Sequence, residues 1–241
     1  MEVPPPPGIR EALREAAGLL ELPRLLFHGR RLAAAPRGNG APVLVLPGYG
    51  TTDASTAPLR AYLRWLGWSV HGWGLGRNGG DAHELRRRIV PIVERLAEAS
   101  GQRVRLVGWS LGGYLAREVA RDLPDLAECV ITLGSPVIGG PKYTAAAHAY
   151  RRRGHDLDAI EAAVAARCEV PLAVPVTAIY SRTDGVVLWQ ACLDETSHGV
   201  EHVEVATTHI GLGFAAEVWE VIASRLATGR GAPWDPSRSA P

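Results

Sequence analysis

The sequence predicts an α/β fold in which helices cover both faces of a mostly parallel sheet of about six strands. Continuous apolar runs such as residues 43–46 are typical of parallel strands that are buried on both faces. Between these runs, apolar residues recur at the spacing of an amphipathic helix. Strands and helices alternate along the chain, which favours one domain with right-handed crossovers. The expected strands are residues 43–46, 68–73, 104–107, 129–133, 176–180 and 202–206.

The first 40 residues are expected to form a helical extension ahead of this domain. An apolar stripe with charged residues opposite predicts an amphipathic helix over residues 9–20, and its buried face would hold Ile9, Leu13, Ala16, Ala17 and Leu20. Pro23 interrupts the pattern, and a second helical piece is expected over residues 24–35. Because the polar face mixes both charge signs, packing on the domain is favoured over binding to a membrane surface.

The first half of the domain carries two glycine-containing loops at the ends of its strands. The strand at residues 43–46 runs into Pro47-Gly48-Tyr49-Gly50, and a helix is expected over residues 56–66. The second strand runs into a glycine-dense loop, residues 74–80. This loop fits a dinucleotide fingerprint poorly, because no helix starts directly at its glycines and no acidic residue ends the following strand. Residues 81–99 are expected to be helical, with a kink at Pro91.

The most informative stretch is residues 104–116, where an apolar strand meets Gly108-Trp109-Ser110-Leu111-Gly112 and a helix follows to about Asp122. A serine at the apex of such a strand–turn–helix has a strained backbone, and its hydroxyl is exposed at the carboxyl end of the sheet. The flanking glycines lack the Cβ that would keep strand and helix apart. The G-x-S-x-G pattern also arises by chance, so its meaning depends on an acid and a histidine in the right places.

A serine hydroxyl becomes a nucleophile when an adjacent base, itself oriented by an acid, removes its proton. The fifth strand runs into the loop that carries Asp184, and the sixth into the loop that carries His209, so both side chains are expected near Ser110. This order of serine, acid and histidine accompanies a G-x-S-x-G elbow. Asp194 and His198 are the second choices. The alternative interpretations are a turn-forming aspartate and a surface histidine.

Two backbone N–H groups are expected to bind the oxyanion of a tetrahedral intermediate. One belongs to Leu111, directly after the nucleophile, and the other to Tyr49, in the loop after the first strand. A tight turn with no further role is the alternative for that loop. The candidate substrate-binding side chains are Trp73, Arg77, Trp109, Tyr143 and Trp189. The aromatic members of this set are equally candidates for the core, and Arg77 is expected to brace its loop together with Asn78.

Residues 137–171 depart from the alternation of strands and helices, and helices are expected at 144–153 and 156–167. An insertion at this edge would overhang the site, so we interpret it as a small lid. An ordinary crossover helix with surface decoration is the alternative. The chain then divides into a helical extension (residues 1–40), the α/β domain (41–228) and a flexible tail (229–241).

Composition argues against several classes of protein. The 241 residues are 46% hydrophobic and 21% charged, which is ample for a buried core. A net charge of +1 with interspersed signs argues against a nucleic-acid partner. The chain lacks a long apolar run and a secretory signal pattern, so we expect a cytoplasmic protein without stable membrane insertion. Reduced thiols are expected for Cys129, Cys168 and Cys192, with a Cys168–Cys192 disulfide as the alternative.

Six segments together resemble the α/β-hydrolases, in particular bacterial lipase- and esterase-like members, over about residues 40–226. These segments are residues 43–50, 72–78, 108–113, 132–136, 180–185 and 208–213. The resemblance implies the same nucleophile, acid, base and oxyanion donors that are named above. Two differences stand out. Many lipases have His-Gly where this chain has Pro47-Gly48, and the first two strands of the family's sheet are replaced by helices before residue 40.

The expected activity is hydrolysis of a carboxylic ester, in a small molecule or a lipid, through an acyl-enzyme that needs no metal or cofactor. Acyl transfer and the cleavage of thioesters or amides would use the same side chains and are the alternatives. A third hypothesis is a binding protein on the same frame with an inert triad, and the intact residues in all three loops argue against it.

Overall fold

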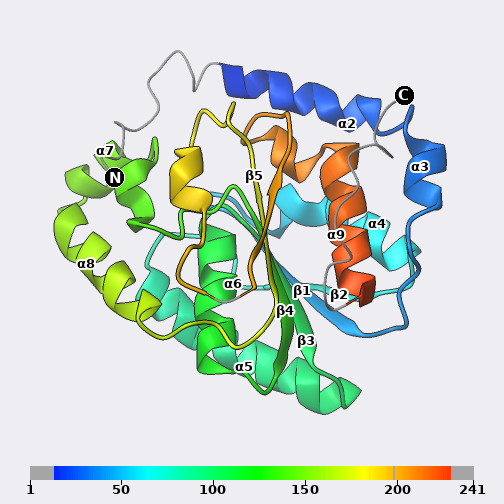
Figure 1. Cartoon of the computed structure of the whole chain (residues 1–241), viewed down its shortest axis with the longest axis horizontal. Helices are drawn as coiled ribbons and strands as arrows, with labels where there is room; N and C mark the ends of the chain where they lie inside the picture. The colour runs from blue at the N-terminus through cyan, green and yellow to red at the C-terminus, as the bar shows by residue number, and fades with distance from the viewer. Residues whose placement is uncertain (1–13, 198, 229–241) are drawn as a thin grey trace.

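The computed structural model describes residues 14–197 and 199–228. Its sheet has six parallel strands in the order β2-β1-β3-β4-β5-β6 (Figure 1). The strands are β1 (Pro42–Leu46), β2 (Ser69–Gly72), β3 (Val104–Trp109), β4 (Ala127–Leu133), β5 (Val176–Tyr180) and β6 (Glu201–Glu204). The predicted α/β fold is therefore confirmed. The described residues ahead of β1 form helices and turns. These stand in place of the first two strands of the α/β-hydrolase sheet, as the resemblance implies.

Helices cover both faces of the sheet (Figure 1). One face carries α5 (Ala82–Ser100) and α6 (Leu111–Asp122), and the other carries α3 (Gly29–Ala33), α4 (Ala57–Trp65) and α9 (Ala216–Thr228). Because successive side chains of a strand point to opposite faces, Val43 and Val45 of β1 enter the core beneath α4 and α9. Leu44 and Leu46 enter the core beneath α5 and α6. Burial on both faces explains the continuous apolar run in the sequence.

Helix α5 is bounded by side-chain and glycine caps. The carboxylate of Asp81 accepts a hydrogen bond from the N–H of Glu84 at 2.9 Å, which satisfies one free donor of the first turn. At the other end, Gly101 adopts a left-handed conformation with φ of 64°. The helix continues as one element through Pro91, where the sequence predicts a kink.

The N-terminal segment is helical, but the buried face differs from the predicted one. Its elements are η1 (Glu15–Leu20), a 3₁₀ helix, and α2 (Glu21–Arg24), followed by turns and α3. The exposed residues of η1 include Ala16, Ala17 and Leu20, whereas Glu15 and Gly18 are buried. The prediction assumed the period of an α-helix and an apolar buried face. A 3₁₀ helix has about three residues per turn, which aligns positions 15 and 18. Ile9 and Leu13 lie outside the described residues.

The segment packs on the domain, as predicted. The side chain of Leu32 is part of the core between the sheet and α9. The Tyr62 hydroxyl donates a hydrogen bond of 3.1 Å to the carbonyl oxygen of Leu32, and Arg31 pairs with Glu220 at 2.6 Å. In Figure 1, η1 and α2 form the blue helical segment that runs across the ends of the strands.

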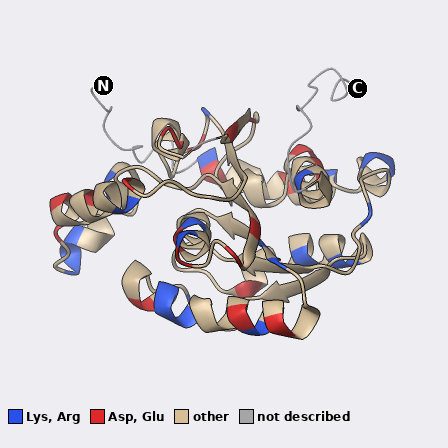
Figure 2. Cartoon of the chain, turned by 60° about the horizontal axis from the view of Figure 1, so that its bottom comes forward, with Lys and Arg blue, Asp and Glu red and all other residues tan. Residues whose placement is uncertain are grey.

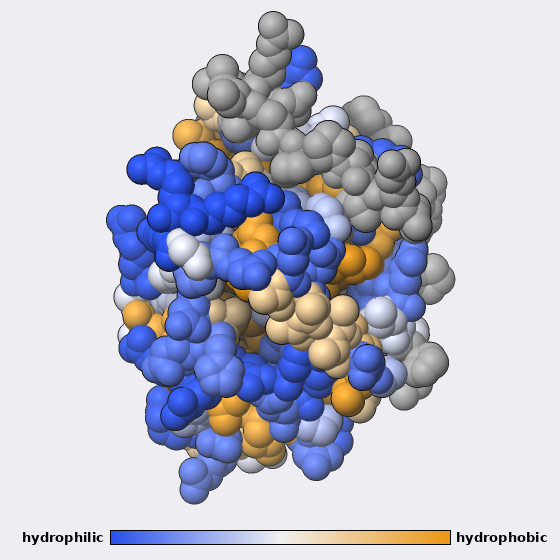
Figure 3. Space-filling view, turned by 90° about the vertical axis from the view of Figure 1, so that its left-hand side faces the viewer, coloured by the Kyte–Doolittle hydropathy of each residue, from blue (hydrophilic) through white to orange (hydrophobic). Residues whose placement is uncertain are grey.

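Both helices predicted between residues 137 and 171 are present, as α7 (Ala147–Arg152) and α8 (Leu157–Cys168), after a short 3₁₀ turn, η3 (Gly140–Tyr143). The Tyr150 hydroxyl donates a hydrogen bond of 3.0 Å to the carbonyl oxygen of Gly80, and its ring lies 5.4 Å from that of Tyr49. The insertion therefore lies against the two glycine-containing loops. The side of the molecule that carries it is largely hydrophilic (Figure 3).

Charged side chains of both signs are mixed over the surface, including along α5 (Figure 2). None of the helices within residues 14–228 is long and apolar enough to cross a membrane. All three cysteines lie within the described part of the chain, and their thiols are free, as predicted. The predicted flexible tail, residues 229–241, lies outside the described residues.

Candidate active site

Ser110 occupies the predicted strained turn between β3 and α6. With φ of 54° and ψ of −125°, it is the only non-glycine residue with a positive φ in the described part of the chain. A Cβ at Gly108 would lie 2.3 Å from the carbonyl oxygen of Gly112, and a Cβ at Gly112 would lie 2.3 Å from that of Leu46. The two glycines are therefore required for the close approach of strand and helix. The N–H of Ser110 donates to the carbonyl oxygen of Leu133 at 2.7 Å, which holds the turn at the end of β4.

Asp184 and His209 form a buried hydrogen-bonded pair at the same edge of the sheet. The distance between His209 Nδ1 and Asp184 Oδ2 is 2.7 Å. The other carboxylate oxygen accepts hydrogen bonds from the N–H groups of Val186 and Val187, at 2.8 and 2.7 Å. An ionised carboxylate only accepts hydrogen bonds, so Nδ1 carries a proton and Nε2 of the neutral ring is an acceptor. The acid therefore fixes both the orientation and the tautomer of the histidine.

The loops that carry this pair are clamped to each other. The carbonyl oxygen of Thr207 accepts hydrogen bonds from the hydroxyls of both Ser181 and Thr183. Gly134, at the end of β4, faces the pair with φ of 53°, and a Cβ there would lie 2.9 Å from both Asp184 Oδ2 and His209 Nδ1. The site therefore depends on a glycine at this position.

Ser110 and His209 are connected through the residue before the serine. The indole N–H of Trp109 donates a hydrogen bond of 3.1 Å to the carbonyl oxygen of His209. The Ser110 hydroxyl itself forms no hydrogen bond to another described residue, so the final contact of the expected triad is not made in this structure. Such contacts are often long or poorly aligned until substrate is bound.

The electrostatic environment favours the protonated form of His209. Burial alone lowers its pKa, because a charged ring is poorly solvated in the interior. The charge and hydrogen bond of Asp184, with a smaller contribution from Glu15, outweigh this effect, so the pKa of His209 lies above the usual value of 6.5. A base with a raised pKa accepts a proton readily.

The two backbone N–H groups that are predicted to bind the oxyanion have no hydrogen-bond partner among the described residues. Neither the N–H of Tyr49 nor that of Leu111 donates to another described residue. The loop that carries Tyr49 runs directly beside the serine, because a Cβ built on Gly48 would lie 3.3 Å from Ser110 Cβ. Both N–H groups are therefore free to meet a ligand atom near Ser110.

Asn78 is expected to brace its own loop, and the structure shows that it also holds the loop after β1. Its side chain is fully buried, and Nδ2 donates to the carbonyl oxygen of Pro47 at 2.9 Å. Its backbone N–H donates to the carbonyl oxygen of Thr51, and its carbonyl oxygen accepts from the N–H of Gly50, both at 2.8 Å. One asparagine thus connects the two glycine-containing loops at three points.

The structure separates the five candidate substrate-binding residues. Trp73 is 1% exposed and packs in the core, which is the second of the two roles that the sequence leaves open for it. Trp109 is buried and holds the loop of His209. The Tyr143 hydroxyl donates a hydrogen bond to Glu161, and the Trp189 ring stacks on Tyr180 and lies beneath Arg182. Arg77 is exposed and forms no hydrogen bond to a described residue.

A residue that sequence reasoning missed lies directly behind the pair. The Glu15 carboxylate accepts hydrogen bonds from the backbone N–H groups of Gly185, His209 and Ile210. In the sequence, Glu15 is one acidic residue on the polar face of an amphipathic helix. No local pattern distinguishes such a residue from one that faces solvent.

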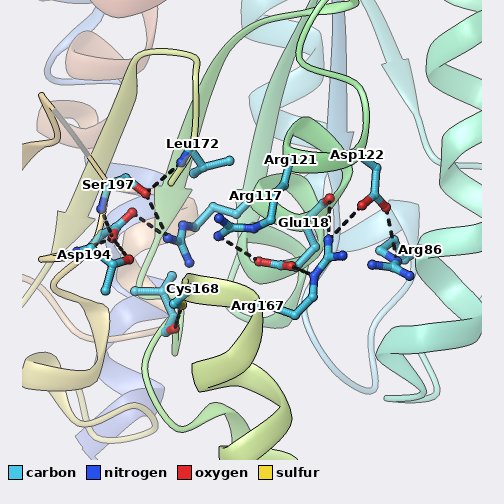
Figure 4. A network of polar contacts seen from close by, with 12 residues as sticks. Arg86, Arg117, Glu118, Arg121, Asp122, Arg167, Cys168, Leu172, Asp194 and Ser197 are labelled. Atoms are coloured by element: carbon cyan, nitrogen blue, oxygen red, sulfur yellow. Dashed lines mark hydrogen bonds and ion pairs between the residues drawn. The ribbon is translucent and has the colours of Figure 1, made fainter. Parts of the chain in front are cut away.

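The second-choice acid has another partner. Asp194 pairs with Arg117 at 2.6 Å, and both side chains are 1% exposed. The pair belongs to a polar network that connects α6 to α5, α8 and the loop before β6 (Figure 4). His198 lies outside the described residues. Within the described residues, no group of three or more potential metal ligands is assembled.

The chain has the α/β-hydrolase fold. Neither a protein-family model nor a curated protein sequence matches it. Among solved structures it is similar to Aspergillus fumigatus lipase B, with 18% identity and a TM-score of 0.60 over 86% of this chain. The chain spans 58% of the length of that lipase.

Two further solved structures are matched over more than nine-tenths of their own length. One comes from the work on LipS and LipT, two metagenome-derived lipolytic enzymes, with 17% identity and a TM-score of 0.61 over 79% of this chain and 93% of that chain. The other is the Paleococcus ferrophilus monoacylglycerol lipase, with 15% identity and a TM-score of 0.59 over 81% of this chain and 97% of that one. At these identities the likeness establishes the fold.

Proposed function

We propose that this protein is a serine hydrolase that cleaves carboxylic esters through an acyl-enzyme. The observation that carries the proposal is the buried hydrogen bond between His209 and Asp184 at the edge of the sheet where the strained turn presents Ser110. Strain at a non-glycine residue persists only where the surrounding structure enforces it, and it is concentrated at functional sites.

In the proposed mechanism, His209 removes the proton of the Ser110 hydroxyl as its oxygen attacks the ester carbonyl carbon. The N–H groups of Tyr49 and Leu111 stabilise the oxyanion that forms. His209 then gives the proton to the leaving alcohol, and Asp184 holds the ring throughout. Water attacks the acyl-enzyme with His209 again as base, which releases the acid and restores the serine.

An ester is favoured as substrate because the similar structures include lipases and lipolytic enzymes. A small-molecule ester and a lipid ester both suit this chemistry. The pair Pro47-Gly48 keeps a backbone donor at Tyr49 but lacks the histidine found there in many lipases. A series of 4-nitrophenyl esters of increasing acyl length separates these two substrate classes.

The decisive variant is Ser110→Ala. We expect it to fold and to lose on the order of 10⁵ to 10⁶ in kcat towards short-chain esters, as happens in triads that act as a unit. Ser69→Ala, at an exposed position on β2, is the matched control and should retain the parent rate. Turnover by Ser110→Ala at the parent rate would contradict the proposal.

Two further measurements separate the alternatives. Product analysis with competing alcohols and amines distinguishes hydrolysis from acyl transfer, because the same side chains would serve both reactions. A fluorophosphonate probe should label the parent protein and leave Ser110→Ala unlabelled. An unlabelled parent protein would instead favour a binding protein on a hydrolase frame.

A further inference from the structure

A carboxylate from the N-terminal segment is buried directly behind the loops of Asp184 and His209. Glu15 is 4% exposed, and its Oε1 accepts hydrogen bonds from the N–H groups of Gly185 at 2.7 Å and His209 at 3.1 Å. Its Oε2 accepts a hydrogen bond from the N–H of Ile210 at 2.8 Å. One side chain therefore binds the residue after the acid, the base itself and the residue after the base.

The partners of Glu15 are all backbone N–H groups. Within the described residues it forms no ion pair, although burial of a carboxylate is costly unless its oxygens are satisfied. Attachment of a surface segment does not require a buried charge, since the contacts of Leu32 and Arg31 already attach it. The position of the charge is therefore the feature that needs an explanation.

A second residue of η1 meets the histidine loop three positions further on. A Cβ built on Gly18 would lie 2.3 Å from Thr208 Oγ1 and 2.4 Å from the backbone nitrogen of Gly211. In a 3₁₀ helix, positions i and i+3 lie on the same side, so Glu15 and Gly18 face this loop together. The segment is thus in close contact with the loop on both sides of His209.

We propose that Glu15 is a positioning residue that holds the backbone of His209 in place behind its hydrogen bond to Asp184. Its hydrogen bonds join the acid loop to the base loop, which fixes the ring relative to Asp184. Its negative charge stabilises the imidazolium that forms as the serine loses its proton. The inference rests on the proposed function, in which His209 is the general base.

The charged groups that act on His209 are few. Asp184 faces it from the loop after β5, and Glu15 faces it from η1. The neighbours from β3 and β4, Trp109 and Gly134, carry no charge. Burial lowers the pKa of His209, and both carboxylates raise it. Loss of the Glu15 charge should therefore keep the imidazole neutral to a lower pH.

The test compares Glu15→Gln with Glu21→Gln, which removes a charge from the same segment at a residue that pairs with Arg24. For Glu15→Gln, the pH at which kcat/KM for a short-chain 4-nitrophenyl ester falls on the acidic side of its profile should move down by roughly half a pH unit to one pH unit. Its kcat should fall, because the new amide N–H₂ faces a backbone donor, while KM stays unchanged. For Glu15→Ala we expect a loss on the order of 10²-fold in kcat. Glu21→Gln should match the parent in all three quantities.

A second readout needs no turnover. In a Ser110→Ala background, NMR titration of the His209 ring should give a lower pKa when Glu15→Gln is added and an unchanged pKa when Glu21→Gln is added. Equal titrations, together with a fall in kcat/KM at the same acidic pH in the two variants, would overturn the proposal. Activity that survives in Ser110→Ala would instead overturn the proposed function, and the NMR titration would still decide the role of Glu15. If Glu15→Ala does not fold, Glu15→Gln and Glu15→Asp supply the same comparison.

Discussion

The indole N–H of Trp109 donates a 3.1 Å hydrogen bond to the carbonyl oxygen of His209, across 100 positions of sequence. Trp109 directly precedes the proposed nucleophile, so this bond connects the serine turn to the loop of the proposed base. The Trp109 ring also meets Phe214 edge-on, with ring centroids 5.9 Å apart. One buried side chain thus links the serine turn directly to the loop of the proposed base.

Trp109→Phe should keep an aromatic ring at this position and remove the hydrogen bond. We expect a loss of about 1–3 kcal/mol in the free energy of unfolding, because a buried carbonyl oxygen is left unpaired. We also expect a lower kcat, since the histidine loop loses its connection to the serine turn. Urea denaturation and ester turnover measure the two effects. Trp65→Phe, at a ring that is 54% exposed, is the control, and equal stability of the two variants would refute the role of the bond.

The strained backbone of Ser110 predicts an unusual order of stability among variants. A non-glycine residue with φ of 54° and ψ of −125° is destabilised by about 1–3 kcal/mol relative to glycine in the same conformation. Ser110→Gly should therefore unfold at a higher urea concentration than Ser110→Ala. At Ser100, near the end of α5, the same pair of substitutions should give the opposite order, because glycine is a poor helix former. A Ser110→Gly protein less stable than Ser110→Ala would show that the turn is unstrained.

The raised pKa of His209 predicts the pH dependence of activity. Burial lowers this pKa, but the carboxylates of Asp184 and Glu15 raise it by a larger amount, so that the pKa lies above 6.5. The base acts in its neutral form, so kcat/KM should fall as the pH drops through a value above 6.5. Asp184→Asn should lower that value and reduce kcat by about 10⁴-fold, because the ring loses its orienting partner. If kcat/KM of Asp184→Asn fell at the same pH as that of the parent protein, the fall would be due to the protonation of a group other than His209.

The same shift predicts the opposite trend for stability. Because the pKa of His209 is higher in the folded protein than in the unfolded chain, its protonation stabilises the fold. This contribution is fully present below the unfolded value and is lost as the pH rises through the folded value. Between the unfolded and folded pKa values of His209, the free energy of unfolding should therefore fall less steeply with rising pH in His209→Gln than in the parent protein. Urea denaturation of both proteins across that range measures the difference.

Asp194→Ala should leave Arg117 as an uncompensated buried charge in the network of Figure 4. We expect a loss of about 3–5 kcal/mol in the free energy of unfolding, which is typical when one partner of a buried ion pair is removed. The exposed Asp158, which pairs with Lys142, is the matched control and should cost little. Specific activity of the folded Asp194→Ala protein should equal that of the parent, because Asp194 lies outside the proposed triad. A loss of activity without a loss of stability would contradict this assignment.

Sequence reasoning placed the serine, the acid and the histidine at one edge because each follows a strand directly. Parallel strands end at the same edge of a sheet, so residues that are far apart in the chain converge there whatever the details of packing. The buried core of β1 was equally predictable, since a continuous apolar run records burial on both faces. The two flanking glycines of Ser110 follow from the same local geometry.

By itself, the sequence determined the order of strands and helices, the strained serine turn and the loops that carry Asp184 and His209, because these depend on local periodicity and turn chemistry. Only the tertiary structure decided that Glu15 is buried behind those loops, that Asp194 pairs with Arg117, and that the Trp73 ring belongs to the core. The physical reason is that a polar side chain is buried only where distant backbone or side-chain partners satisfy it. Those partners come together only when the chain has folded.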